Sequence, residues 1–317
     1  MNSPQGLPRL LAAALVALGL AGAARAAPLD DATRTDATIQ AGDVTLGATL
    51  YRPAGARGDL PAVVLAHGSA PSTRKELGFY INNGLRMGVA VLAVDKRGTG
   101  QSTGRFEDWS LEGSTAWFSL LAGDVVHSVR WLSTQPGIDP QRIGLLGGSQ
   151  AGWIMPLAAS REPLVRFIIA GEGVPLPAYI EDAHGTYLEA ATRGQDLATP
   201  AQLAAADAFA EDYDNRVGFD PTPILERLST PTLWIFGLYD EAIPTQLSIR
   251  RIGELQKAGR KNHAIHVFPF GDHNFRNVFT GDRYEIAPVA RRWLEEIGVL
   301  KPGTPAGPGA GAPRRRR

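Results

Sequence analysis

The chain has 317 residues and equal numbers of basic and acidic side chains, 32 of each, so its formal net charge is zero. This balance argues against nucleic acid as a partner, because proteins that bind it carry a basic surface to neutralise phosphates. The chain contains no cysteine, which excludes disulfides and a lipid-modified amino terminus. Its length allows one large domain with an insertion.

The amino terminus has the form of an export signal. Residues 10–20 are an apolar run behind Arg9, and residues 24–26 read A-R-A, the A-x-A form of a cleavage site. The alternative is a membrane anchor, but eleven residues at about 1.5 Å each cannot cross a hydrocarbon core of about 30 Å. The sequence therefore predicts a signal peptide at residues 1–26, export to the periplasm or beyond, and no stable membrane insertion afterwards.

Two short segments are predicted to lie outside the folded domain. Residues 27–36 have no clear periodicity and are interpreted as a linker. Residues 299–317 form a tail rich in glycine, proline and alanine that cannot bury a core and ends in four arginines. We expect those arginines to be solvated; contact with an anionic lipid or polymer is the alternative.

The first half of the body alternates strands and helices. A hairpin is predicted from residues 37–40 and 44–51, followed by strands at 62–66 and 89–94 and helices at 75–87 and 121–135. The apolar runs of these strands have no polar alternation, which is typical of parallel strands covered on both faces.

The second half resumes the same pattern after an interruption. Strands are predicted at 143–146, 167–170, 232–237 and 264–268, and helices at 246–257 and 284–297. Residues 37–172 and 230–298 thus predict an α/β fold, with a mostly parallel central sheet and helices on both faces.

Residues 173–229 contain helical signals and no strand pattern. Thr199, Pro200 and Gln202 form a capping box with proline at the first helical position. We interpret this segment as a helical cap inserted over one edge of the sheet.

The segment from Gly147 to Ala151 predicts a nucleophile elbow centred on Ser149. An apolar strand ends at Gly147 and Gly148, and a helix pattern begins after the serine. The turn needs small residues two before and two after the nucleophile, since larger side chains would collide with neighbouring backbone. The start of a helix also offers free N–H groups to a developing oxyanion.

A serine hydroxyl needs a base to accept its proton and a carboxylate to orient that base. Of the six histidines, only His273 lies in a loop directly after the last predicted strand. We interpret it as the base; a loop histidine that caps nearby groups is the alternative. No histidine pair has a spacing such as H-E-x-x-H, so we expect no metal and no other cofactor.

Asp240 follows the strand before the one that delivers His273, which gives the chain order serine, acid, histidine. Glu172, just past another strand, is a rival acid because the same edge can also reach the base. Glu241 is expected to be solvated. Asp95 and Arg97 are expected to form a buried ion pair that holds a loop.

These motifs together resemble the α/β-hydrolases, specifically the branch of serine esterases and acylaminoacyl- or prolyl-peptidase-like hydrolases. The matching segments are HGS at 67–69, DKRGTGQSTG at 95–104, GIDPQRIGLLGGSQAGW at 137–153, GLYDEAIP at 237–244 and GDHNF at 271–275. The resemblance implies Ser149 as nucleophile, Asp240 as acid and His273 as base. It also implies an oxyanion hole formed by the backbone N–H groups of Ser69 and Gln150.

The sequence thus predicts an exported serine hydrolase that acts on a small-molecule ester through an acyl-enzyme. An aminoacyl or peptide hydrolase of the same fold is the alternative, because a triad does not distinguish an alcohol from an amine leaving group. A non-catalytic binding protein on the same scaffold is a third hypothesis.

Overall fold

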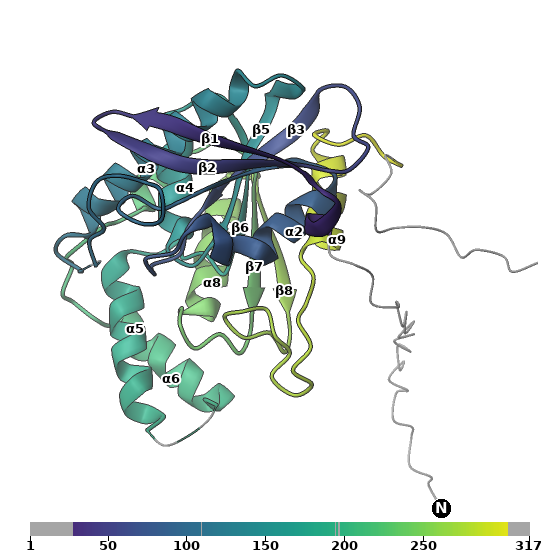
Figure 1. Ribbon diagram of the computed structural model, residues 1–317. Helices are drawn as coiled ribbons and strands as arrows, with labels where there is room; N and C mark the ends of the chain where they lie inside the picture. Colours follow the sequence, from purple (N-terminus) through teal and green to yellow (C-terminus); the bar gives the residue numbers. More distant parts are fainter. Residues whose placement is uncertain (1–27, 109, 194, 196, 304–317) are drawn as a thin grey trace, which may run out of the picture.

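The computed structural model describes residues 28–303 except 109, 194 and 196, and its centre is one eight-stranded sheet (Figure 1). The predicted signal peptide and the arginines of the predicted tail lie outside the described residues. Within the described part, no helix combines the length and apolar character that a membrane crossing requires.

The sheet has the order β1-β2-β4-β3-β5-β6-β7-β8. β1 pairs antiparallel with β2, and β2 pairs antiparallel with β4, while every later pair is parallel. The strands are β1 (Thr33–Ala41), β2 (Val44–Arg52), β3 (Leu60–Ala66), β4 (Ala90–Val94), β5 (Ile138–Gly148), β6 (Val165–Gly171), β7 (Thr232–Gly237) and β8 (His263–Phe268). The predicted α/β class is therefore confirmed, including the hairpin at its start.

Helices cover both faces of the sheet, which explains the continuous apolar strands. One buried cluster joins the sheet to α3 (Ser114–Ser133), α4 (Ala151–Ala159) and α8 (Thr245–Lys257). The other joins it to α2 (Gly78–Met87) and α9 (Ala287–Glu296). Phe118 and Trp234 in the first cluster and Phe167 in the second are fully buried. The parallel strands thus lie inside the molecule, and their carboxyl ends meet at one edge.

The segment predicted as a cap contains α5 (Ala178–Ala191), α6 (Pro200–Glu211) and the short α7 (Thr222–Leu225), with no strand among its described residues. α5 and α6 pack together and project from the body below the sheet (Figure 1). The predicted capping box is present, because the Thr199 side chain accepts from the Gln202 N–H and the Gln202 side chain accepts from the Thr199 N–H.

Several boundaries differ from the prediction. β1 begins at Thr33, and α1 (Pro28–Asp31) precedes it, so the predicted linker is largely structured. The helix predicted at 75–87 is divided into a 3₁₀ turn, η1 (Arg74–Leu77), and α2. α3 begins seven residues before the predicted start. Its N-cap residue, Gly113, forms no side-chain hydrogen bond, so the sequence carries no capping signal at this position.

The predicted tail also begins too early. After Gly298, which has a φ of 77°, the chain folds back on α9. The N–H groups of Val299 and Leu300 both donate to the Leu294 carbonyl, at 2.9 and 3.1 Å, and the two side chains are buried. These residues therefore belong to the core.

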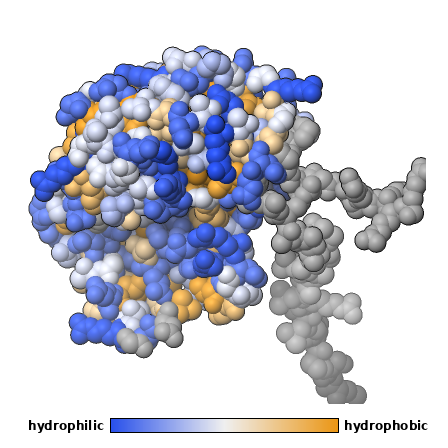
Figure 2. Space-filling view, viewed as in Figure 1, coloured by the Kyte–Doolittle hydropathy of each residue, from blue (hydrophilic) through white to orange (hydrophobic). Residues whose placement is uncertain are grey.

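The surface shown in Figure 2 is mainly hydrophilic, with smaller hydrophobic areas between the polar residues. Among the described residues, the large exposed apolar side chains are Leu120, Phe209, Phe270 and Phe279. Phe270 and Phe279 stand on either side of His273 in the chain and contact each other edge to face, with ring centres 5.4 Å apart.

Candidate active site

Ser149 lies on the sharp turn between β5 and α4, as the elbow prediction requires. Its φ is 57°, a left-handed conformation that costs a side-chain-bearing residue about 1–3 kcal/mol. The turn is held from β6, because the Ser149 N–H donates to the carbonyls of Gly171 and Glu172, at 3.1 and 3.2 Å. The strained backbone therefore presents the serine side chain at the carboxyl edge of the sheet.

The space around the turn explains its small residues. A Cβ on Gly147 would lie 2.4 Å from the Ala66 carbonyl oxygen and 2.9 Å from the Ala151 Cβ. A Cβ on Gly148 would lie 1.9 Å from the hydroxyl oxygen of Tyr80. The crowding at 147 and 151 agrees with the sequence argument, whereas the need for glycine at 148 comes from a tyrosine on α2 that no local pattern indicates.

The two segments predicted to supply the oxyanion hole lie next to the serine. Gly68 is so close that a Cβ on it would sit 3.6 Å from the Ser149 Cβ. Ser69 follows it in the chain, and buried Gln150 is the residue at the amino terminus of α4. His67 is a structural neighbour, since its Nε2 lies 2.6 Å from the Val94 carbonyl oxygen and burial lowers its pKa to about 4.

His273 and Asp240 are joined by a hydrogen bond. His273 Nδ1 lies 2.8 Å from Asp240 Oδ2. Asp240 is 1% exposed, and its other oxygen accepts from the N–H groups of Ala242 and Ile243, at 2.8 and 3.2 Å. The loop after β7 thus fixes the carboxylate, which in turn fixes the imidazole of the loop after β8.

The electrostatics of this pair suit a proton acceptor. Burial acts to lower the pKa of His273, but the charge and hydrogen bond of Asp240 outweigh it, with Glu181 and Asp272 acting in the same direction. The net result is a raised pKa. The pair thus stabilises an imidazolium, the species that forms when histidine takes a proton from a nucleophile.

Glu172, the rival acid, lies beside the pair without bonding to the imidazole. It is 2% exposed, has a φ of 51°, and accepts a hydrogen bond from the Phe275 N–H at 3.1 Å. Burial and then the nearby Asp240 raise its pKa well above the usual value, which favours the protonated form. Glu172 therefore links β6 to the loop that carries His273.

Ligand atoms of Glu172, Asp240 and His273 all lie within 4.8 Å of one another, a spacing that a metal ion could bridge. The same spacing is explained without a metal, because His273 Nδ1 already bonds to Asp240 and Glu172 already accepts from a backbone N–H. We interpret the cluster as an acid-histidine pair, Asp240 and His273, with the carboxyl group of Glu172 next to it.

The predicted ion pair between Asp95 and Arg97 is wrong, although both residues are structural. Asp95 pairs with Arg74 of η1 and also accepts from the backbone N–H groups of Arg74 and Gln101, both at 2.8 Å. Arg97 forms a two-point contact with Asp124 of α3, at 2.6 and 3.0 Å. Each charge was correctly expected to hold the loop, but its partner comes from a distant helix that the sequence pattern does not identify.

Two further carboxylates lie near this edge, Glu241 on the loop after β7 and Glu181 on α5 of the cap. Glu241, expected to be solvated, is half-buried and accepts from the Ala198 N–H at 2.5 Å, so this expectation was wrong. On α5, burial and then the nearby Asp182 raise the pKa of Glu181 to about 8, against the opposing effect of His273. The cap thus contributes one acidic group, Glu181, near the histidine.

Comparisons with known proteins identify the family and the fold of the chain. A model described as the prolyl oligopeptidase family matches residues 79–297. An uncharacterized protein of Mycobacterium tuberculosis strain H37Rv is 26% identical over 255 residues, which cover 79% of this chain and 75% of that protein.

Two solved structures share the fold at low identity. An esterase of Pyrococcus furiosus has a TM-score of 0.60 at 19% identity, with 87% of this chain and 95% of that one covered. The acylaminoacyl peptidase of Pyrococcus horikoshii has a TM-score of 0.58 at 18% identity, with 84% of this chain but 42% of that chain covered.

Proposed function

The chain belongs to the prolyl oligopeptidase family of α/β-hydrolases, and from this premise we propose that it is a serine hydrolase that cleaves carboxylic esters through a Ser149–His273–Asp240 triad. The observation that carries the proposal is the 2.8 Å hydrogen bond between His273 and a buried Asp240, at the sheet edge where the elbow presents Ser149.

Each step of the reaction follows from these groups. Ser149 Oγ attacks the ester carbonyl carbon while His273 Nε2 takes the hydroxyl proton, and Asp240 stabilises the imidazolium. The carbonyl oxygen becomes an oxyanion that accepts from the N–H groups of Gln150 and Ser69. Collapse breaks the bond to the alcohol, which leaves with the proton from His273. Water then repeats the sequence on the acyl-enzyme and releases the carboxylic acid and free serine.

The ester proposal is supported by the similarity to the Pyrococcus furiosus esterase, which covers most of both chains. The alternative is an aminoacyl or peptide hydrolase, supported by the family description and by the acylaminoacyl peptidase. Both leaving groups use the same triad, so the two hypotheses differ in substrate and share every residue of the mechanism. A binding protein without catalysis is disfavoured by a paired acid and histidine at the same sheet edge as a strained serine.

A substrate panel tests the proposal. We expect the purified protein to hydrolyse p-nitrophenyl esters, with kcat/KM depending on acyl length, and to act at least tenfold more slowly on aminoacyl p-nitroanilides. The control is Ser149→Ala, which must lose the activity toward both. Faster hydrolysis of the anilides would favour the peptidase alternative, and hydrolysis retained in Ser149→Ala would refute the triad.

Two accompanying proposals have simple tests. We propose that the reaction needs no metal, so ester hydrolysis should be unchanged by EDTA; a loss that zinc restores would contradict this. We also propose export with cleavage after residue 26, so mass spectrometry of the protein from its native host should show an amino terminus at Ala27. An intact Met1 on exported protein would contradict the signal-peptide prediction.

A further inference from the structure

Lys96 follows β4 and is buried directly behind the proposed oxyanion hole. It is 3% exposed, and its Nζ donates to the carbonyl oxygens of Gly68, Ser69 and Ala70, at 2.8, 3.0 and 3.3 Å. The same Nζ lies 3.2 Å from the side-chain oxygen Oε1 of Gln150. One ammonium therefore contacts both chain segments that carry the proposed oxyanion donors.

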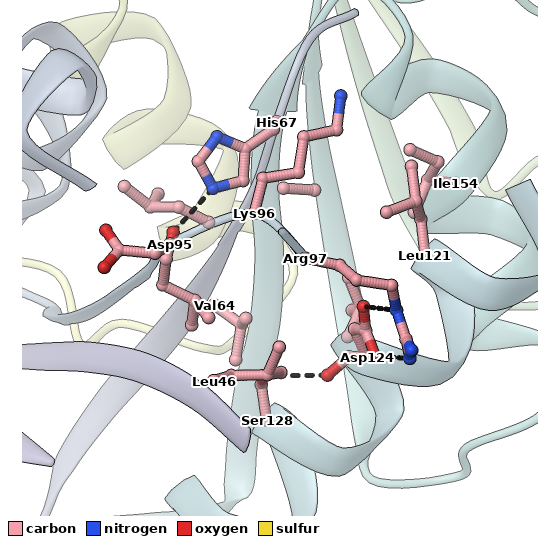
Figure 3. A pocket seen from close by; sticks show the side chains of 14 residues that line it. Leu46, Val64, His67, Asp95, Lys96, Arg97, Leu121, Asp124, Ser128 and Ile154 are labelled. Carbon is pink, nitrogen blue, oxygen red and sulfur yellow. Dashed lines mark hydrogen bonds and ion pairs between the residues drawn. The ribbon is translucent and has the colours of Figure 1, made fainter. Parts of the chain in front are cut away.

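The ammonium is held by neutral oxygens instead of by a carboxylate. Among the described residues Lys96 forms no ion pair, since its neighbours Asp95 and Arg97 pair with Arg74 and Asp124. Figure 3 shows the Lys96 side chain pointing away from the Arg97–Asp124 pair; all three residues line a cavity of about 40 Å³. Burying a charge without a carboxylate partner is costly, and the four oxygen contacts together with the Phe106 ring, whose centre lies 5.2 Å from Nζ, offset that cost.

The direction of the hydrogen bonds from Lys96 indicates how the loop at 68–70 is oriented. Successive carbonyls that converge on one ammonium must face the same side of the loop, which leaves the N–H groups of that loop to face away from it. Because Gly68 also lies against Ser149, we take the side of the loop opposite Lys96 to be the side of the nucleophile. Within the described residues the buried Gln150 Nε2 has no hydrogen-bond partner, and Lys96 is the partner that holds this side chain.

We infer that Lys96 is a positioning residue for the oxyanion hole: its ammonium orients the loop at 68–70 and Gln150 so that their backbone N–H groups converge beside Ser149. The inference rests on the proposed function. Lys96 does not touch the substrate, and its positive charge behind the donors also favours the oxyanion that develops in the transition state over the neutral carbonyl.

The charge of Lys96 can be removed by pH as well as by mutation. Burial lowers the pKa of Lys96 to about 8. Of the charged groups near it, His67 has a pKa that burial lowers to about 4, and the carboxylates Asp95 and Asp124 are paired with Arg74 and Arg97. A neutral amine has two donors in place of three, so the tether weakens above pH 8.

The experiment compares Lys96→Met with Lys75→Met, which removes the same charge from an exposed position on η1. For each variant kcat and KM are measured on the best ester, together with the inhibition constant of a trifluoromethyl ketone, whose hemiketal oxyanion occupies the oxyanion hole. We expect Lys96→Met to lower kcat by about 10²–10³-fold, the cost of losing one oxyanion donor, and to weaken ketone binding in proportion. KM should change by less than threefold, and Lys75→Met should match the wild type.

The pH profile of the wild type gives a second readout if Lys96→Met does not fold. We expect kcat to fall on the alkaline side with a midpoint near pH 8. Glu181, whose pKa burial raises to about 8, titrates in the same range, so the profile is repeated in Glu181→Gln, where the fall should persist.

A folded Lys96→Met with kcat and ketone affinity within threefold of the wild type would overturn the inference and leave the proposed function intact. A kcat that stays constant from pH 7 to 10 would overturn it in the same way. A wild-type protein that neither hydrolyses the esters nor reacts with a fluorophosphonate would overturn both the inference and the proposed function.

Discussion

Two loops at the carboxyl edge of the sheet place a buried aspartate in nearly the same setting. Asp95 follows β4 and Asp240 follows β7, and they are 2% and 1% exposed. Each accepts hydrogen bonds from two backbone N–H groups. The difference is the side chain that completes each pair, which is Arg74 for Asp95 and His273 for Asp240.

That difference separates a structural ion pair, Asp95–Arg74, from a pair that can exchange a proton, Asp240–His273. A guanidinium stays protonated at every working pH, so the Asp95 pair only holds its loop, whereas an imidazole exchanges its proton near neutrality. His273 also keeps 27% of its side chain exposed, while the Arg74 side chain keeps 12%. Burial of an acid at this edge therefore does not by itself indicate catalysis. The informative features are the side chain that pairs with the acid and the exposure of that side chain to solvent.

The largest effect is expected from removal of the proposed nucleophile, Ser149. Ser149→Ala should lower kcat for ester hydrolysis by about 10⁶-fold, because only binding and oxyanion contributions remain. Steady-state rates on the best ester measure this, with circular dichroism as the control for folding. Activity near that of the wild type would end the triad interpretation.

Asp240→Asn tests the reactive side of the comparison. The amide keeps the shape of the carboxylate but can donate to His273 and fix the wrong tautomer, so kcat should fall by roughly 10⁴-fold. In the wild type, kcat/KM should fall as pH drops through a value above the ordinary histidine pKa of about 6.5, because the base must be neutral and its pKa is raised. In the variant this acid limb should move to lower pH, since the charge that raises the pKa is gone. An unmoved limb would contradict the assignment.

Glu172→Gln separates the two candidate acids. Because burial favours the protonated form of Glu172 and its Oε1 accepts from a backbone N–H, the amide should replace it with a loss of around tenfold or less. The measurement is the ratio of kcat in this variant to kcat in Asp240→Asn at one pH, with melting curves for both. If Glu172→Gln proved the more damaging by a hundredfold, the acid would lie after β6.

Asp95→Asn should have the smallest effect on activity and a clear effect on stability. Breaking a buried ion pair leaves Arg74 without its carboxylate and costs about 3–5 kcal/mol, which corresponds to a melting temperature lower by about 10 °C. Below that temperature kcat should stay within threefold of the wild type. A kcat loss comparable to that of Asp240→Asn would remove the distinction between the two aspartates.

The sequence predicted the part of this edge that depends on local pattern. Strand periodicity was enough to predict the sheet, and the chain order of the motifs singled out Asp240 and His273, which the structure joins by a hydrogen bond. Glu172 remained a rival because its position after β6 is equivalent in sequence terms. In the structure the imidazole of His273 bonds to Asp240 and not to Glu172, which supports Asp240 as the acid.

The remaining features depend on contacts between distant residues. Arg74 lies 21 residues before Asp95, and Asp124 lies 27 residues after Arg97, on helices whose charged positions resemble any solvated face. Likewise, nothing local marks Tyr80 as the reason for glycine at 148 or Lys96 as the partner of three carbonyls. Such pairs are set by the packing of helices on the sheet and have no signature in one chain segment.

The central claim, an activated serine at the elbow, is tested most directly by a fluorophosphonate probe, which reacts covalently only with such a serine. The wild type, Ser149→Ala and Asp240→Asn are each incubated with the probe. The mass of the intact protein is then measured, and the labelled residue is identified by peptide mass spectrometry. We predict one adduct per chain on Ser149, none in Ser149→Ala and much slower labelling in Asp240→Asn. An unlabelled wild type, or an adduct on another residue that persists in Ser149→Ala, would contradict the account.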